Sequence, residues 1–268
     1  MPVTIEAAHE ADAAASARIH LEAMDYNLLL HSQFPNAEAL AWLQDFLEKD
    51  TTEHINGEGK RMLVARTEGE AEPAAFVKWS IYGGEEPNAE DFAWPDFCRA
   101  EYLDSYGELT ANTRKKVLGQ APHYRKCDPV GCSLAEMSCH VVRRAKPSFP
   151  PSRLGKRTVA AWRNSLLTRH HLDVTFLCTK PSFGGRGAAT ALLREVQRQA
   201  AACGSVVVLE STMSAVTFYE RLGFQDSAHI EMKLPARGRT EPTEIYEEKC
   251  MVWRHAAGTD DPSYVKET

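Results

Sequence analysis

The stretch Pro181-Ser182-Phe183-Gly184-Gly185-Arg186-Gly187-Ala188-Ala189-Thr190 joins a segment typical of a strand, 171–179, to a strongly helical one, 187–203. Small residues at the start of a helix let backbone N–H groups approach an anion closely, and the helix dipole adds to the attraction. The stretch therefore predicts either a site for the phosphates of a cofactor or a tight strand-to-helix turn that binds nothing.

The spacing of the glycines narrows the choice of cofactor. Gly184 to Ala189 does not fit the dinucleotide pattern G-x-G-x-x-G, and no Lys-Ser/Thr pair follows as in a P-loop. About thirty residues further on, after a near-continuous apolar strand at 205–211, comes Ala215-Val216-Thr217-Phe218-Tyr219-Glu220-Arg221-Leu222-Gly223-Phe224. The chain thus has two strand–helix units, each with its own motif.

Together these segments resemble the GCN5-related N-acetyltransferases, the GNAT family. The family signature Arg/Gln-x-x-Gly-x-Gly/Ala corresponds to 184–189, with Gly184 in place of the usual Gln or Arg. The second segment is similar to the family pattern Ala-x-x-(Phe/Leu)-Tyr-x-x-x-Gly-Phe. The resemblance covers 172–224 closely and the order of elements over 2–82 loosely. It implies an α/β (α+β) GNAT fold with a mixed, mostly antiparallel sheet, splayed at the acetyl-CoA site and covered by helices on both faces.

The resemblance also implies a cofactor site for acetyl-CoA, which is a cosubstrate of the reaction. Backbone groups of Leu177 and Thr179 would hydrogen-bond the pantetheine arm, and a backbone N–H there would serve the thioester carbonyl as an oxyanion donor. Cys178 and Phe218 are assigned to the same site. Backbone amides would hold the pyrophosphate, and the positive charge of Arg186 would strengthen the binding. These amides belong to Gly184, Gly185, Arg186, Gly187, Ala188, Ala189 and Thr190.

Two residues are the candidates for proton transfer. Tyr219 matches the family tyrosine that protonates the leaving thiolate, and a hydroxyl with a pKa near 10 is a proton donor at neutral pH; the alternative is a packing tyrosine on an amphipathic helix. Glu210 is the candidate base for the acceptor amine, but it would equally suit a ligand for a cationic substrate or a cap for the following turn. Asp173 and Glu136 are weaker candidates for the same role.

The seven cysteines are odd in number and scattered, which indicates reduced thiols. Cys178 lies beside the expected thioester, yet no histidine partner is evident, so we interpret it as a core residue and expect direct transfer without a covalent enzyme intermediate. A second group fits no standard zinc spacing and is interpreted as buried thiols, so that no metal site is expected; it comprises Cys127, Cys132, Cys139 and His140.

The rest of the chain is expected to complete one domain spanning 1–268, with an atypical insertion at about 83–152. We expect this insertion to shape the acceptor pocket. The aromatic residues that could line this pocket are Trp79, Tyr82, Phe92, Trp94 and Tyr102, and core packing is expected to account for at least half of them. The pair His170-His171 is interpreted as a surface turn that is more typical of solvent than of acceptor contact. Periodicity predicts helices at 10–26, 37–47, 102–118 and 215–222, and strands at 2–7, 61–66, 74–82, 229–234 and 247–254.

Composition limits the partners. Lys and Arg number 31 against 37 Asp and Glu, a net charge of −6, which argues against a protein whose main partner is nucleic acid. No apolar run approaches the roughly 18 residues of a membrane span, and the N-terminus lacks the order of a secretory signal, so a cytoplasmic protein is expected.

The expected function is therefore an acyltransferase, namely an acetyl-CoA-dependent N-acetyltransferase acting on a primary amine, with a small molecule favoured as acceptor. Two alternatives stay open: a protein or peptide N-acetyltransferase, and a non-catalytic acyl-CoA-binding relative. The acceptor, the preferred acyl length and the choice between monomer and homodimer are left open.

Overall fold

The computed structural model describes residues 3–83, 93–119 and 170–255. The helices in these ranges are α1 (Ala13–Met24), α2 (Leu28–Gln33), α3 (Ala37–Asn56), α4 (Ala100–Gly119), α6 (Ala188–Ala202) and α7 (Val216–Arg221). The strands are β1 (Val3–Ala7), β2 (Lys60–Thr67), β3 (Ala75–Gly83), β4 (His170–Thr179), β5 (Val206–Thr212), β6 (Gln225–Leu234) and β7 (Glu244–Trp253). Short 3-10 segments precede three of the helices: η1 (Glu10–Asp12), η2 (Pro181–Phe183) and η3 (Met213–Ala215).

The helices and strands expected within the described ranges are confirmed, with differences at α2, α3, β6 and β7. Strands β6 and β7 begin at Gln225 and Glu244, before the expected positions 229 and 247. Helix α3 continues to Asn56 instead of ending near Leu47, because its polar second half still has one buried side, formed by Thr51 and His54. The Thr51 hydroxyl donates to the Leu47 carbonyl at 2.6 Å. Helix α2 was not expected; the Asn27 side chain caps it by accepting from the Leu29 amide at 2.8 Å.

The seven strands form one sheet in the order β1-β2-β3-β4-β5-β7-β6. All neighbouring pairs are antiparallel except β4 and β5, which are parallel. This parallel contact covers only three residue pairs, from His171–Val206 to Asp173–Val208. Beyond it, β4 stays paired with β3 as far as Thr179 and β5 stays paired with β7 as far as Thr212, so the sheet opens between the two strands. We call this opening the splay.

A bulge in β4 lies at the start of the splay. Val174 pairs with Trp79 and Phe176 with Lys78, so the exposed Thr175 has no partner on β3. The extra residue reverses the alternation of side chains: Leu172 and Val174 belong to the core under α6, whereas Phe176 and Cys178 belong to the cluster with Ile19 of α1.

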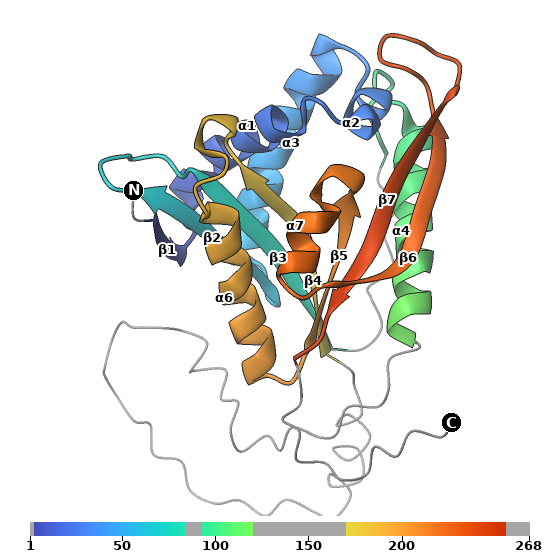
Figure 1. Ribbon diagram of the computed structural model, residues 1–268. Coiled ribbons are helices and arrows are strands. Elements are labelled where there is room, and N and C mark those ends of the chain that lie inside the picture. The colour runs from blue at the N-terminus through green and yellow to red at the C-terminus, as the bar shows by residue number, and fades with distance from the viewer. Residues whose placement is uncertain (1–2, 84–92, 120–169, 256–268) are drawn as a thin grey trace, which may run out of the picture.

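Helices cover both faces of the sheet (Figure 1). Helices α6 and α7 lie on one face, where the fully buried Leu192 and Val196 of α6 pack against Val77 and Trp79 of β3. The other face carries α1 and α3 over β2 to β4, and α4 over β5 to β7, where Val117 packs with Val208, Ile230 and Cys250. No helix in the described ranges is both long and apolar enough to cross a membrane.

Candidate functional site at the splay

The splay exposes one edge of each parting strand. Leu177 and Thr179 are partly exposed on β4, and their β3 partners, Val77 and Ala75, lie on the other side of the strand. Beyond Asp173, the edge that faces away from β3 has no partner among the described strands, because β5 has already turned away. An extended ligand can therefore hydrogen-bond to this edge in the manner of an added strand.

The glycine-rich turn lies at the same end of β4. It is exposed from Gly184 to Gly187, and Gly185 and Gly187 have positive φ angles of 73° and 84°. Gly187 is the N-cap of α6, whose first amides have no acceptor within the helix. The Arg186 guanidinium lies 4.9 Å from the Phe183 ring centroid, which holds its charge beside the turn. The turn thus offers backbone donors and one cation to a phosphate group.

Cys178 has the properties of a core residue. Its side chain is 5% exposed and packs in the cluster with Ile19 and Phe76, and burial raises the pKa of its thiol to about 12. A thiol with such a pKa is neutral at physiological pH and is a poor nucleophile. This environment agrees with direct transfer rather than a covalent cysteine intermediate.

Tyr219 lies on α7 and is 8% exposed. Its ring makes edge-to-face contacts with Phe218 at 5.1 Å and Phe224 at 5.6 Å between centroids. Burial raises the pKa of its hydroxyl, and the negative charge of Glu248 adds to this effect. Tyr219 therefore keeps its proton at neutral pH. It packs in the core under α6 and α7, in the cluster that also contains Leu177 near the end of β4. This environment is compatible with a packing tyrosine and with a proton donor.

Glu210 belongs to β5 but faces the opposite side of the sheet from Tyr219. Arg114 of α4 lies between two carboxylates there: its Nη1 is 2.7 Å from Asp173 Oδ2 and 3.5 Å from Glu210 Oε2. The other oxygen of Glu210, Oε1, is buried and has no hydrogen-bond partner in the described part of the chain. Burial raises the pKa of Glu210 to about 8, opposed by Arg114 and reinforced by the charges of Asp173 and Glu248.

Sequence reasoning missed a second carboxylate near the splay. Glu248 of β7 is 4% exposed, and its two oxygens accept from the Tyr106 hydroxyl at 2.7 Å and the Tyr246 hydroxyl at 2.5 Å. Tyr246 in turn accepts from the Asn27 side chain at 3.2 Å, which links β7 to the turn before α2. Burial raises the pKa of Glu248 against these two tyrosine donors, which lower it.

Arg114 was also missed, although a signal for it was present. It lies in α4, inside the segment interpreted as an insertion, between the inward-facing Thr110 and Val117. The spacing 106, 110, 114 and 117 marks one face of a helix, and an arginine on a buried face needs an acidic partner. Asp173, considered only a weak candidate from the sequence, is that partner.

Two further expectations are wrong. His170 and His171 belong to β4 rather than to a turn, and the His171 side chain is 7% exposed and stacks on Tyr82 at 5.1 Å. Trp79 is 1% exposed beneath α6, so it lines no pocket, and Trp94 packs on Trp42 in a separate cluster below α3. The turn expected at the histidines is wrong because β4 already begins at His170. The strand expected around Trp79 is correct, but its side chain is covered by α6 and therefore lies in the core.

Several other candidates lie outside the described residues: Phe92, Glu136 and the group Cys127, Cys132, Cys139 and His140.

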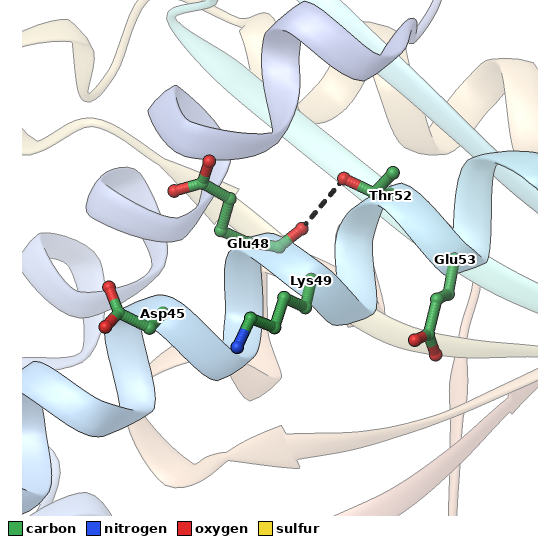
Figure 2. Close-up of a pocket in the computed structure, with 5 residues that line it drawn as sticks. All are labelled: Asp45, Glu48, Lys49, Thr52 and Glu53. Atoms are coloured by element: carbon green, nitrogen blue, oxygen red, sulfur yellow. Dashed lines mark hydrogen bonds between the residues drawn. The ribbon is translucent and has the colours of Figure 1, made fainter.

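A hollow on α3 is unrelated to the splay (Figure 2). It is lined by Asp45, Glu48, Lys49, Thr52 and Glu53, all from the outer side of one helix. The buried stripe of α3, which includes Leu43 and Leu47, lies on the opposite side. The hollow contains no residue of the splay, so it is not the candidate site.

Comparison with known proteins gives a match to one family model over part of the chain, and a fold. Residues 157–233 match the model of the acetyltransferase (GNAT) domain, and this range includes both β4 and the glycine-rich turn. A search of curated proteins finds no significant match.

Solved structures of similar fold are distant in sequence. A mosquito arylalkylamine N-acetyltransferase like 5b is 13% identical with a TM-score of 0.53, and the alignment covers 95% of this chain and 100% of the mosquito chain. A structure described as histone acetyltransferase HPA2 and related acetyltransferase, from Corynebacterium glutamicum, is 18% identical with a TM-score of 0.50, covering 97% and 99% of the two chains. The mixed, splayed sheet with helices on both faces, expected from the sequence, is confirmed.

Proposed function

Because this chain carries an acetyltransferase domain of the GNAT family, we propose that it transfers an acetyl group from acetyl-CoA to the primary amine of a small molecule. The observation that carries the proposal is the splay itself. Two parallel strands separate after three residue pairs, and a glycine-rich turn with a helix N-terminus lies at the end where they part. One end of the sheet thus combines a strand edge for an extended arm with donors for a pyrophosphate.

The residues at the splay fit acetyl-CoA, which supplies an acetyl group activated as a thioester. Gly187 matters most for the phosphates, because its φ of 84° and its open surroundings leave no side chain between the turn and a ligand. Leu177 and Thr179 bind the pantetheine arm through their backbone groups. A backbone N–H of this edge also stabilises negative charge on the carbonyl oxygen during attack.

Glu210 and Tyr219 then divide the two proton transfers. Glu210 removes a proton from the acceptor ammonium, directly or through water, so that the neutral amine attacks the carbonyl carbon. As the C–S bond breaks, Tyr219 donates its proton to the departing sulfur. The nitrogen of the new amide gives up its second proton, which passes through water to Tyr219 and restores the hydroxyl. The two side chains lie on opposite faces of the sheet, so the base and the acid act from different sides.

The preference for a small-molecule acceptor is supported by the mosquito structure of similar fold, described as an arylalkylamine N-acetyltransferase. The Corynebacterium structure, described as a histone acetyltransferase, makes a protein acceptor the second candidate. A thiol-release assay with amines, polyamines, amino acids and short peptides separates the two.

Acetyl-CoA is expected to raise the melting temperature, and Gly187→Val is expected to weaken its binding about tenfold or more, because a side chain at that N-cap crowds the phosphates. Calorimetric titration measures the affinity.

Gly69→Val is the matched control for this variant. Gly69 has a φ of 85°, is exposed, and lies in the turn between β2 and β3, so the backbone strain is the same but no ligand is near. Equal affinities in the two variants, or no thermal shift of the unmodified protein with acetyl-CoA, would refute the cofactor assignment.

A further inference from the structure

Glu210 and Glu248 are diagonal neighbours on one face of the sheet. Glu210 of β5 lies opposite Cys250 of β7, and Glu248 lies opposite Thr212 two residues further along. Diagonal neighbours in an antiparallel pair have Cα atoms about 7–8 Å apart, within reach of two glutamate side chains. Both carboxylates face α4, at the end of β5 where the splay is open.

Positive charge near these two carboxylates is scarce among the described residues. Glu248 has two tyrosine hydroxyls as donors and forms no ion pair with a described residue. Arg114 reaches one oxygen of Glu210 at 3.5 Å but lies closer to Asp173, at 2.7 Å. The second oxygen of Glu210 is buried and has no hydrogen-bond partner within 3–83, 93–119 and 170–255. Buried carboxylates are stable as ions only when a cation or enough donors compensate them, so this arrangement favours a cationic ligand.

We propose that the acceptor binds as an ammonium ion beside Glu210 and Glu248, and that this pair selects amines that lack a carboxylate on the carbon bearing the amino group. The inference rests on the proposed function and adds a substrate class to it. Beside a bound ammonium ion Glu210 is ionised, because a positive charge close by favours the carboxylate form. A free α-amino acid would bring its own carboxylate beside both glutamates, and like charges held close together in a partly buried site repel strongly. Amines derived from amino acids by loss of that carboxylate avoid the repulsion.

The test compares matched pairs that differ only in the carboxylate: phenethylamine with phenylalanine, and agmatine with arginine. For the unmodified protein with saturating acetyl-CoA, we expect kcat/KM for the amine to exceed that for the amino acid about tenfold or more in both pairs. In Glu248→Gln, which keeps the size of the side chain and removes its charge, we expect this ratio to fall at least threefold.

Glu247→Gln is the matched control. Glu247 precedes Glu248 on β7 and is exposed on the other face, 3.2 Å from His229, so its charge should not affect the ratio. Equal or faster turnover of the amino acids, a ratio that is unchanged in Glu248→Gln, or no turnover of any of these compounds despite a thermal shift with acetyl-CoA would each overturn the inference. The absence of that thermal shift would instead refute the proposed function.

Discussion

Replacing Tyr219 with phenylalanine is expected to lower kcat about 100-fold while leaving the affinity for acetyl-CoA nearly unchanged. The variant removes a single hydroxyl group from a side chain that is 8% exposed, and the ring keeps its contacts with Phe218 and Phe224. Without the hydroxyl, the sulfur must leave as a thiolate. Steady-state kinetics with the best amine of the panel, and calorimetric titration of acetyl-CoA, measure the two quantities.

Thr51→Val provides the comparison for the loss of a buried hydroxyl elsewhere. Thr51 is 1% exposed on α3, and its hydroxyl donates to the Leu47 carbonyl of the same helix, away from α7 and the splay. Its variant should keep kcat within about twofold, because a substitution away from the site has little effect on the reaction. If Tyr219→Phe behaves like Thr51→Val, the tyrosine only packs, and the leaving thiolate is protonated by another group.

The pH dependence of kcat/KM for the acceptor is expected to rise to a plateau with a midpoint near pH 8, and Glu210→Gln is expected to abolish this rise and lower kcat/KM about 100-fold. The direction follows from the role: a general base acts when deprotonated, and burial raises the pKa of Glu210 in the free protein from 4.5 to about 8. Initial rates measured from about pH 6 to 9.5 at acceptor concentrations well below KM give the profile, because kcat/KM reports the free protein.

Arg114 provides an independent check on this assignment. Its charge lowers the pKa of Glu210, so Arg114→Met should move the midpoint to higher pH, whereas Arg114→Lys keeps the charge and should move it less. The lysine variant also covers the possibility that the methionine variant is unstable, since Asp173 would lose a close cationic partner. A midpoint that is the same in all three proteins would show that another group titrates.

The raised pKa of Glu210 also affects the stability of the folded protein. Because the pKa of Glu210 is higher in the folded protein than its ordinary value of 4.5, the folded state holds a proton that the unfolded chain has lost. Its contribution to stability is therefore present below pH 4.5 and is lost as the pH rises through about 8. Glu210→Gln removes this part of the pH dependence.

Much of the fold could be predicted from local patterns. The helical spacing in 187–203 corresponds to α6, which buries one continuous side. The apolar run in 205–211 corresponds to β5, most of whose residues are buried. The cofactor and catalytic assignments stay predictions, since they were carried by the motifs around Gly187 and Tyr219. The motifs do not predict that the sheet separates Glu210 from Tyr219. This separation follows from the packing of β5, because Leu209 packs in the cluster with Tyr219, whereas Val208 packs in the cluster with Cys250 on the other face.

The residues that were missed depend on tertiary pairing. Arg114 meets Asp173 across 59 positions of sequence, and Tyr106 meets Glu248 across 142. Alternation along β7 did contain a signal, because Tyr246, Glu248 and Cys250 share the buried face. A charged residue on a buried face indicates that nearby donors or opposite charges stabilise it. Here Tyr106 and Arg114 supply such groups from α4, and the sequence pattern of β7 alone does not predict which helix packs there.

The unpaired Thr175 makes β4 sensitive to a change in length of a single residue. A deletion at this point would restore regular alternation and exchange the sides of Phe176, Leu177 and Cys178, turning the strand edge that now opens on the splay. The number of residues in β4 is therefore constrained as well as their type. The bulge thus determines which backbone groups and side chains of β4 face the splay.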